Sequence, residues 1–140
     1  MKLFVDTWGW LTLRDRGEAR HREAVDFYNH FHSEGGAVYT TDYVLDETFT
    51  LLFRRLPFSQ AQESVEILEE AVLKGYLNLE WITPERFAQT KVLRLRFQDK
   101  PRISFTDLSS MVVMEELGVS MILTGDIHFT HVGMGLQIVP

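Results

Sequence analysis

The chain has 140 residues and a formal charge of −6, from 20 Asp and Glu against 14 Lys and Arg. This length favours one domain spanning residues 1–140, and a composition of 45% hydrophobic and 24% charged residues excludes a disordered or collagen-like chain. The absence of Cys excludes a disulfide framework, a thiolate nucleophile and a Cys-based zinc site.

The hydropathy pattern predicts a cytoplasmic protein with no membrane association. Asp6 interrupts the opening apolar run before the core of a signal peptide could form. Nowhere does an apolar run approach the ~20 residues that a membrane span needs.

Short apolar runs, typical of buried parallel strands, alternate along the chain with the three-four spacing of amphipathic helices. We expect strands at 2–5, 37–41, 77–82 and 120–124, and a fifth at 136–139. We expect helices at 18–32, 44–55, 59–74, 84–97 and 104–117. The segment 7–13 receives no assignment. Because parallel pairing needs a long crossover, this alternation predicts a mainly parallel sheet of four to five strands covered on both faces.

Capping patterns mark where three of these helices begin. Ser59 with Gln62, and Ser104 with Asp107, have the spacing of a capping box, in which two side chains satisfy each other's backbone amides. Thr83 precedes a proline at the first helical position.

Acidic residues fall near the ends of the expected strands. Asp6 and Asp126 follow the first and fourth strands, and Asp107 lies in the first turn of its helix. Glu47 lies among apolar residues in the helix after the second strand, and we prefer it to the adjacent Asp46. In an open α/β sheet, ligands bind outside the carboxyl ends of the strands. We therefore expect these acids to form a site at that edge.

Each acid also has a structural interpretation. Asp107 completes a capping box, Asp6 and Asp126 could begin turns or helices, and Glu47 could be an exposed helix residue. Their conjunction favours a site, because four separate elements bring a carboxylate to the same edge.

Four neighbouring carboxylates would repel one another strongly. Two of them about 5 Å apart repel by roughly 3 kcal/mol at an effective dielectric constant near 20. Summed over all pairs, this exceeds the typical stability of a domain, about 5–15 kcal/mol, so either some are protonated or a metal ion lies among them. Oxygen ligands favour Mg²⁺ or Mn²⁺ over zinc, and Mg²⁺ commonly completes its shell with water and phosphate oxygens. The expected substrate is therefore a phosphate ester.

Three further patterns could serve such a site. Residues 86–102 carry six basic residues against one acid, a local charge of +5 typical of a solvated helix face or, beside a metal site, of a phosphate track. Trp8 and Trp10 could stack on bases, although packing in the core or a partner interface is the alternative that we favour. His128 and His131 lack a third strong zinc ligand, so we expect His128 to orient the turn at Asp126.

Four motifs in order resemble those of PIN-domain ribonucleases, especially the VapC-like group. They are Phe-Val-Asp-Thr at 4–7, Tyr-Val-Leu-Asp-Glu-Thr at 43–48, Ser-Phe-Thr-Asp-Leu-Ser at 104–109 and Leu-Thr-Gly-Asp-Ile-His-Phe at 123–129. The resemblance covers nearly the whole chain. It implies a three-layer α/β/α fold in which Thr124 supports an acidic quartet that binds Mg²⁺ or Mn²⁺. The members of that quartet would be Asp6, Glu47, Asp107 and Asp126. Gly125 differs from relatives that carry a larger residue there.

The resulting hypothesis is a metal-dependent endoribonuclease, with RNA as its substrate. Family members in toxin–antitoxin pairs are silenced by a small partner protein and commonly form homodimers, so the resemblance implies an antitoxin partner and a homodimer. The alternatives are a metal-dependent DNA nuclease and an inactive RNA- or antitoxin-binding module. A phosphoacceptor receiver domain fits less well, because Asp6 has no paired acid and no lysine follows Lys100.

Overall fold

In a computed structural model, the chain forms five strands and six α-helices. The structure describes the backbone of residues 1–140 and the side chains of all of them except Ile127 and Thr130. The strands are β1 (Lys2–Val5), β2 (Ala37–Thr41), β3 (Asn78–Glu80), β4 (Met121–Leu123) and β5 (Gln137–Val139). The helices are α1 (Thr7–Arg14), α2 (His21–Ser33), α3 (Asp42–Arg55), α4 (Phe58–Leu73), α5 (Pro84–Arg96) and α6 (Phe105–Leu117), with a short 3₁₀ helix, η1, at Ile127–Thr130.

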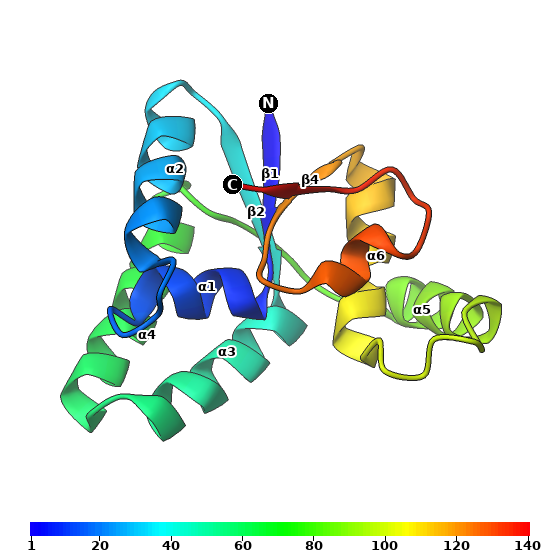
Figure 1. The fold of residues 1–140 in the computed structure, drawn as a ribbon, viewed down its shortest axis with the longest axis horizontal. Helices are drawn as coiled ribbons and strands as arrows, with labels where there is room; N and C mark the ends of the chain where they lie inside the picture. The colour runs from blue at the N-terminus through cyan, green and yellow to red at the C-terminus, as the bar shows by residue number, and fades with distance from the viewer.

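All five strands belong to one parallel sheet with the order β3-β2-β1-β4-β5. β1 is central, and its residues Leu3, Phe4 and Val5 are completely buried. Figure 1 shows α1, α2 and α4 on one side of the sheet and α5 and α6 on the other, while α3 runs along the edge where β1 and β2 end. The predicted fold class, an α/β domain with a parallel sheet covered on both faces, is confirmed.

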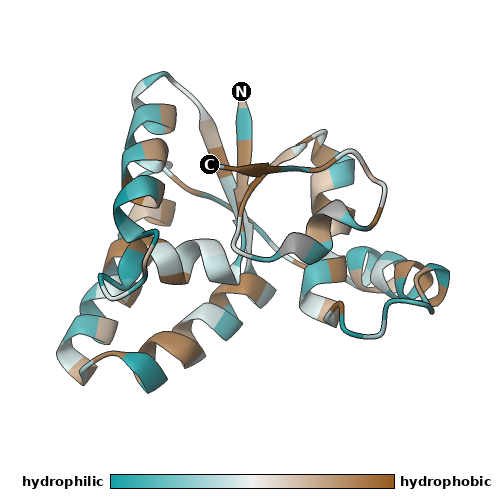
Figure 2. Cartoon of the chain, viewed as in Figure 1, coloured by the Kyte–Doolittle hydropathy of each residue, from teal (hydrophilic) through white to brown (hydrophobic). Residues whose placement is uncertain are grey.

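The helices are amphipathic and contribute one apolar face each to the core. Figure 2 shows hydrophobic and hydrophilic residues alternating along them. In α6 the buried residues include Leu108, Met111 and Met114, which pack with the sheet residues in the main core. Among the helices that the structure describes, none is both long and apolar enough to cross a membrane.

The unassigned segment 7–13 is helical. Asp6 is the N-cap of α1, where its side chain accepts a hydrogen bond from the amide of Gly9. The helix buries Trp10 and Leu11. The helix has only eight residues, which include one glycine, Gly9, and two β-branched threonines, Thr7 and Thr12, so its helical pattern is too weak to be recognised from sequence. Packing against the rest of the fold decides its structure.

Several other predicted boundaries differ from the structure by one to three residues. The strands expected at 77–82 and 120–124 are shorter, and the helix expected from Val44 begins at Asp42. The helix expected from Ser59 begins at Phe58, and its N-cap Pro57 makes no side-chain capping bond, so the capping box of Ser59 and Gln62 is wrong. The helix expected from Glu18 begins at His21. The capping box of Ser104 and Asp107 is confirmed, as is the Thr83 cap.

Gly9 is required where α1 crosses the end of β4. A Cβ atom at this position would clash with the backbone oxygen of Leu123 and lie 2.8 Å from Cγ1 of Val5. We expect Gly9→Ala to lower the free energy of unfolding by about 3 kcal/mol, because a packed backbone cannot move aside cheaply. Urea denaturation measures the effect. Gly125→Ala is the control, since a Cβ there meets no heavy atom within 4 Å, and we expect it to change stability by less than about 0.5 kcal/mol. Equal effects of the two substitutions would contradict this account.

Candidate functional site

Asp6 lies at the carboxyl end of β1 and is the most buried of the predicted site acids. Asp6 is 2% exposed to solvent. Oδ1 accepts a hydrogen bond from the amide of Gly9 at 2.8 Å, and Oδ2 accepts one from the hydroxyl of Thr124 at 2.6 Å. The first bond caps α1 and the second ties β1 to the end of β4. Asp6 is therefore both a helix cap and a fixed carboxylate at the edge of the sheet.

Thr124 connects Asp6 to Asp126. Its hydroxyl donates to Asp6 and accepts a hydrogen bond from the amide of Asp126 at 2.9 Å. Oδ1 of Asp126 in turn accepts from the backbone amide of His128 at 2.8 Å and lies 3.0 Å from the Nδ1 atom of the same residue. One small hydroxyl residue thus sets the relative position of two acids from distant parts of the chain.

Asp107 and Glu47 reach the same edge from α6 and α3. The amide of Asp107 donates to Oγ of Ser104 at 3.0 Å, and its carboxylate accepts a longer bond, 3.4 Å, from the amide of Ser104. Asp107 and Glu47 are both half-buried, whereas Asp46 is exposed and lines a different groove, between α3 and α4. Glu47 and Asp46 therefore lie in different environments, and Glu47 is the one whose charge acts on Asp107.

Shifted pKa values show that these acids share one electrostatic environment. Burial raises the pKa of Asp6 from 3.8 to about 8, against the lowering effect of its hydrogen bonds from Thr124 and Gly9, and the charges of Asp107 and Asp126 raise it further. Burial also raises the pKa of Asp107 to about 6, and the charges of Asp126 and Glu47 add to the increase. Carboxylates from four segments of the chain are thus close enough to repel one another.

The acids have little compensating charge. Among the side chains that the structure describes, no Lys or Arg forms an ion pair with any of the four, and the imidazole of His128 beside Asp126 is the sole basic neighbour within 4.0 Å. Nor do any three Asp, Glu or His side chains among the described residues converge into a ready-made coordination shell. The residues provide oxygen donors and an unbalanced negative charge, and this chemistry fits a hard divalent cation.

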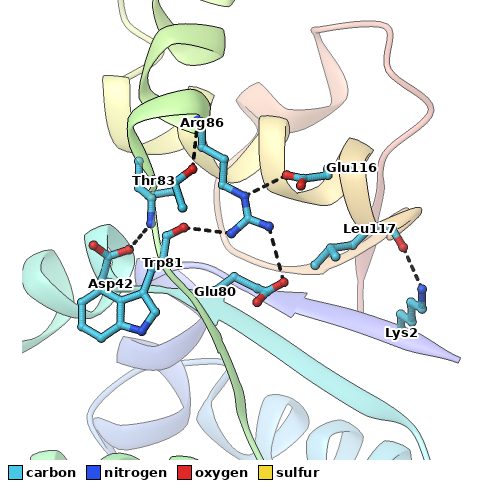
Figure 3. A network of polar contacts seen from close by, with 9 residues as sticks. Lys2, Asp42, Glu80, Trp81, Thr83, Arg86, Glu116 and Leu117 are labelled. Carbon is cyan, nitrogen blue, oxygen red and sulfur yellow. Dashed lines mark hydrogen bonds and ion pairs between the residues drawn. The ribbon is translucent and has the colours of Figure 1, made fainter.

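Two of the six basic residues between 86 and 102 are used within the fold. Arg86 donates from Nε to Glu116 at 2.8 Å and from Nη1 to the carbonyl oxygen of Trp81 at 2.8 Å, and its Nη2 lies 3.5 Å from Glu80. Figure 3 shows these contacts around the guanidinium. Arg94 donates to backbone carbonyl oxygens of the loop that follows α5. The phosphate-track interpretation is therefore wrong for these two, because their charged groups already have partners inside the protein.

The two tryptophans have different environments. Trp10 is buried, donates from Nε1 to the hydroxyl of Thr40 at 3.1 Å and packs edge-on against Tyr28. Trp8 is 42% exposed, with the guanidinium of Arg55 5.1 Å from the ring centroid. Core packing, the interpretation favoured from sequence, holds for Trp10. His128 contacts Asp126 through one backbone hydrogen bond and through the close approach of its imidazole to the same carboxylate oxygen, so both groups of His128 lie at the Asp126 turn.

The chain resembles known proteins over almost its whole length. A profile of the PIN domain matches residues 3–134. The 23S rRNA-specific endonuclease VapC20 of Mycobacterium tuberculosis is 31% identical over 131 residues, which cover 94% of each protein. The VapC ribonuclease of Archaeoglobus fulgidus is 31% identical over 128 residues, which cover 87% of this chain and 76% of that one.

Solved structures agree with these similarities. The crystal structure of VapC20 from Mycobacterium tuberculosis, described as a sarcin-ricin loop cleaving toxin, superposes with a TM-score of 0.80 at 30% identity, covering 94% of this chain and 95% of that one. VapBC2 from Rickettsia felis, bound to a DNA fragment from its promoter, gives a TM-score of 0.71 at 15% identity, covering 99% and 98%. At that identity, the second similarity concerns the fold alone.

Proposed function

Because the chain belongs to the PIN-domain family and is a homologue of VapC ribonuclease toxins, we propose that it is a divalent-metal-dependent endoribonuclease. The observation that carries the proposal is the buried carboxylate of Asp6, which shares its electrostatic environment with Asp107 and Asp126 and has no basic partner among the described residues. Burying an acidic side chain without a basic partner lowers the stability of the protein on its own. A bound cation would offset this cost.

Four residues would hold the ion, which we propose to be Mg²⁺ or Mn²⁺. When bound, such an ion neutralises charge on a phosphate and lowers the pKa of a coordinated water. The proposed ligands are Asp6, Glu47, Asp107 and Asp126.

Thr124 is proposed to keep two of these ligands in position. Its hydroxyl donates a hydrogen bond to Oδ2 of Asp6. This bond uses one lone pair of Oδ2, and the other lone pair would be available to a metal ion. Its contact with the amide of Asp126 fixes the turn that presents the second carboxylate. Because both contacts use one oxygen atom, a movement of β4 would displace both acids together.

The reaction that these residues support is hydrolysis by water. The four carboxylates would hold the ion at the carboxyl edge of the sheet, where its charge would offset that of the phosphate. Water would add to phosphorus as the bond from phosphorus to the 3′-oxygen breaks, and the leaving 3′-oxygen would take up a proton. This chemistry does not use the 2′-hydroxyl of RNA as its nucleophile. The expected products therefore carry 5′-phosphate and 3′-hydroxyl ends.

We also propose that the protein acts as the toxin of a toxin–antitoxin pair, with a VapB-like protein as its partner. The support is the similarity to VapC20 and, for the fold, to the Rickettsia felis complex. A homodimer is proposed on the same family grounds. Co-expression with the product of an adjacent small reading frame tests the partner, and light scattering tests the dimer.

A cleavage assay with a matched pair of variants tests the catalytic proposal. The first substrate is a hairpin with the sarcin-ricin loop sequence, beside linear RNA and DNA oligonucleotides, each with Mn²⁺ or with EDTA. We expect Mn²⁺-dependent RNA cleavage with 5′-phosphate ends. Glu47→Gln should lower the rate at least about 100-fold, because a ligand is lost. Asp46→Asn makes the same change of charge on the exposed side of α3 and should leave the rate within about twofold.

Other outcomes separate the alternatives. Products with a 2′,3′-cyclic phosphate would exclude attack by water. Cleavage of DNA but not of RNA would identify a DNA nuclease. RNA binding without turnover in Mn²⁺ would identify the inactive binding module.

A further inference from the structure

A small cavity lies beside the acidic residues and is lined by a different set of side chains. Its volume is about 280 Å³, and it is formed by the loop 99–103 together with His128 and His131. It is the size of a site for a single small group. Its polar lining includes Lys100, Arg102 and the two histidines, with Asp99 as the one acid.

The loop that carries Lys100 and Arg102 is held by Arg94 of α5. Nη2 of Arg94 donates to the carbonyl oxygens of Phe97 and Lys100, both at 2.7 Å, and Nη1 donates to that of Ile103. The loop also closes on itself through the amides of Lys100 and Ile103. One guanidinium thus binds three carbonyl oxygens that are spaced three residues apart, and these bonds hold the loop in one conformation.

The cavity and the proposed metal site share a wall. His128 lines the cavity, and its Nδ1 and backbone amide both contact Oδ1 of Asp126. Ile103 also lines the cavity, and it directly precedes Ser104, whose hydroxyl caps the helix that carries Asp107. A molecule bound to the acids and a group in the cavity would therefore be neighbours.

The two basic side chains of the cavity, Lys100 and Arg102, differ in whether they form an ion pair within the protein. Lys100 pairs with Asp99 at 2.8 Å. Arg102 is exposed and forms no ion pair with any side chain that the structure describes. The guanidinium of Arg102 is thus available to a ligand, and the ligand that it would bind is an anion.

We propose that this cavity binds a backbone phosphate of the RNA, next to the phosphate that is cleaved, with Arg102 as its main contact. This inference rests on the proposed function, since it assigns part of the RNA to a place beside the acids. An extended polyanion explains why an acidic site and a basic cavity adjoin. The acids need a metal ion to accept one phosphate, whereas the cavity accepts the next without one.

The test measures RNA binding in EDTA, where cleavage is absent, by fluorescence anisotropy of a labelled 12-nucleotide RNA. We expect Arg102→Ala to weaken binding about 5–10-fold and to reduce the slope of log K against log salt by about 0.7, as for one lost phosphate contact. Arg102→Lys should keep most of the affinity. Arg22→Ala is the control, because Arg22 is exposed on α2, across the sheet from α5 and α6 (Figure 1), and it should change affinity less than twofold.

Failure of this inference can be distinguished from failure of the proposed function. If Arg102→Ala and Arg22→Ala bind RNA alike, or if the wild-type protein does not bind RNA in EDTA, the phosphate cavity is wrong even when the protein cleaves RNA in Mn²⁺. If Arg102→Ala binds more weakly than Arg22→Ala but the wild-type protein does not cleave, the cavity stands and the catalytic proposal fails.

Discussion

Asp6→Asn is expected to abolish RNA cleavage and, in the same protein, to raise the melting temperature measured in EDTA. The catalytic loss should reach at least about 10³-fold, because an amide is a poor ligand for a divalent cation and Asp6 is the proposed ligand with the least freedom to move. The gain in stability comes from the removal of a buried acid. An Asn side chain keeps the acceptor for the amide of Gly9 and is neutral at every pH, so it avoids the cost of holding the buried Asp6 carboxyl in its protonated form near neutral pH, about 1–3 kcal/mol.

The combination of the two effects separates a functional acid from a structural one. A purely structural cap at this position would lose stability, not gain it, when its charge is removed, since an anion at a helix N-terminus is favourable. Cleavage is measured on the hairpin RNA with Mn²⁺, and stability by thermal unfolding followed by circular dichroism. Asp46→Asn is again the control. A variant that unfolds at a markedly lower temperature would contradict the proposed role of Asp6.

The sequence predicts most of the fold because its strands are short apolar runs and its longer helices have a clear three-four pattern. The signals were strongest where several agreed, as at Thr83, which caps a helix with a proline at its first position, and at Ser104, where a complete capping box forms. They failed where one local motif stood alone. Ser59 and Gln62 match the spacing of a capping box, yet the chain enters α4 from Pro57, and the hydroxyl is not needed.

The position of α1 illustrates a limit of local signals. Nothing within residues 7–13 specifies a helix, but Asp6 caps it and the backbone of Gly9 fits against Leu123. The contact with Leu123 comes from a residue more than a hundred positions away. The same holds for the bond from Thr124 to Asp6. Such contacts depend on strand order, which periodicity alone does not give.

The candidate acids could be named from sequence because they share a position relative to the strands, and the structure brings them into one electrostatic environment. The basic residues could not be sorted in this way. Arg86, Arg94 and Arg102 belong to the same basic stretch of the sequence, but two of them bind partners within the fold and the third is exposed. Only tertiary contacts distinguish them: Arg86 binds Glu116 of α6, Arg94 binds the loop after α5, and Arg102 has neither kind of partner among the residues that the structure describes.

The stability of the metal-free protein is expected to fall as the pH rises. The folded protein holds a proton on Asp6 up to a pKa of about 8, whereas the unfolded chain releases it near 3.8. Between these values the folded state binds more protons than the unfolded state, so raising the pH favours unfolding, and the loss is complete above about pH 8. Asp107, with a pKa of about 6, adds a smaller effect of the same sign at lower pH. From about pH 6 to about pH 8, the expected loss is about 2 kcal/mol, or about 5–8 °C in melting temperature.

Mn²⁺ should reverse this dependence, because a cation binds the carboxylates only when they have lost their protons. At a concentration of about 100 times its Kd, the ion adds about 2.7 kcal/mol of stability, and this increment should be largest at about pH 8, where competition from protons is weakest. Thermal melts of the wild-type protein and of Asp6→Asn, in EDTA and in Mn²⁺ over this pH range, measure both effects. The difference between the two proteins isolates Asp6 from every other group that titrates. Superimposable pH profiles of the two proteins in EDTA would show that the Asp6 carboxyl is not held protonated by its burial, and the case for a cation as its natural partner would lose its physical basis.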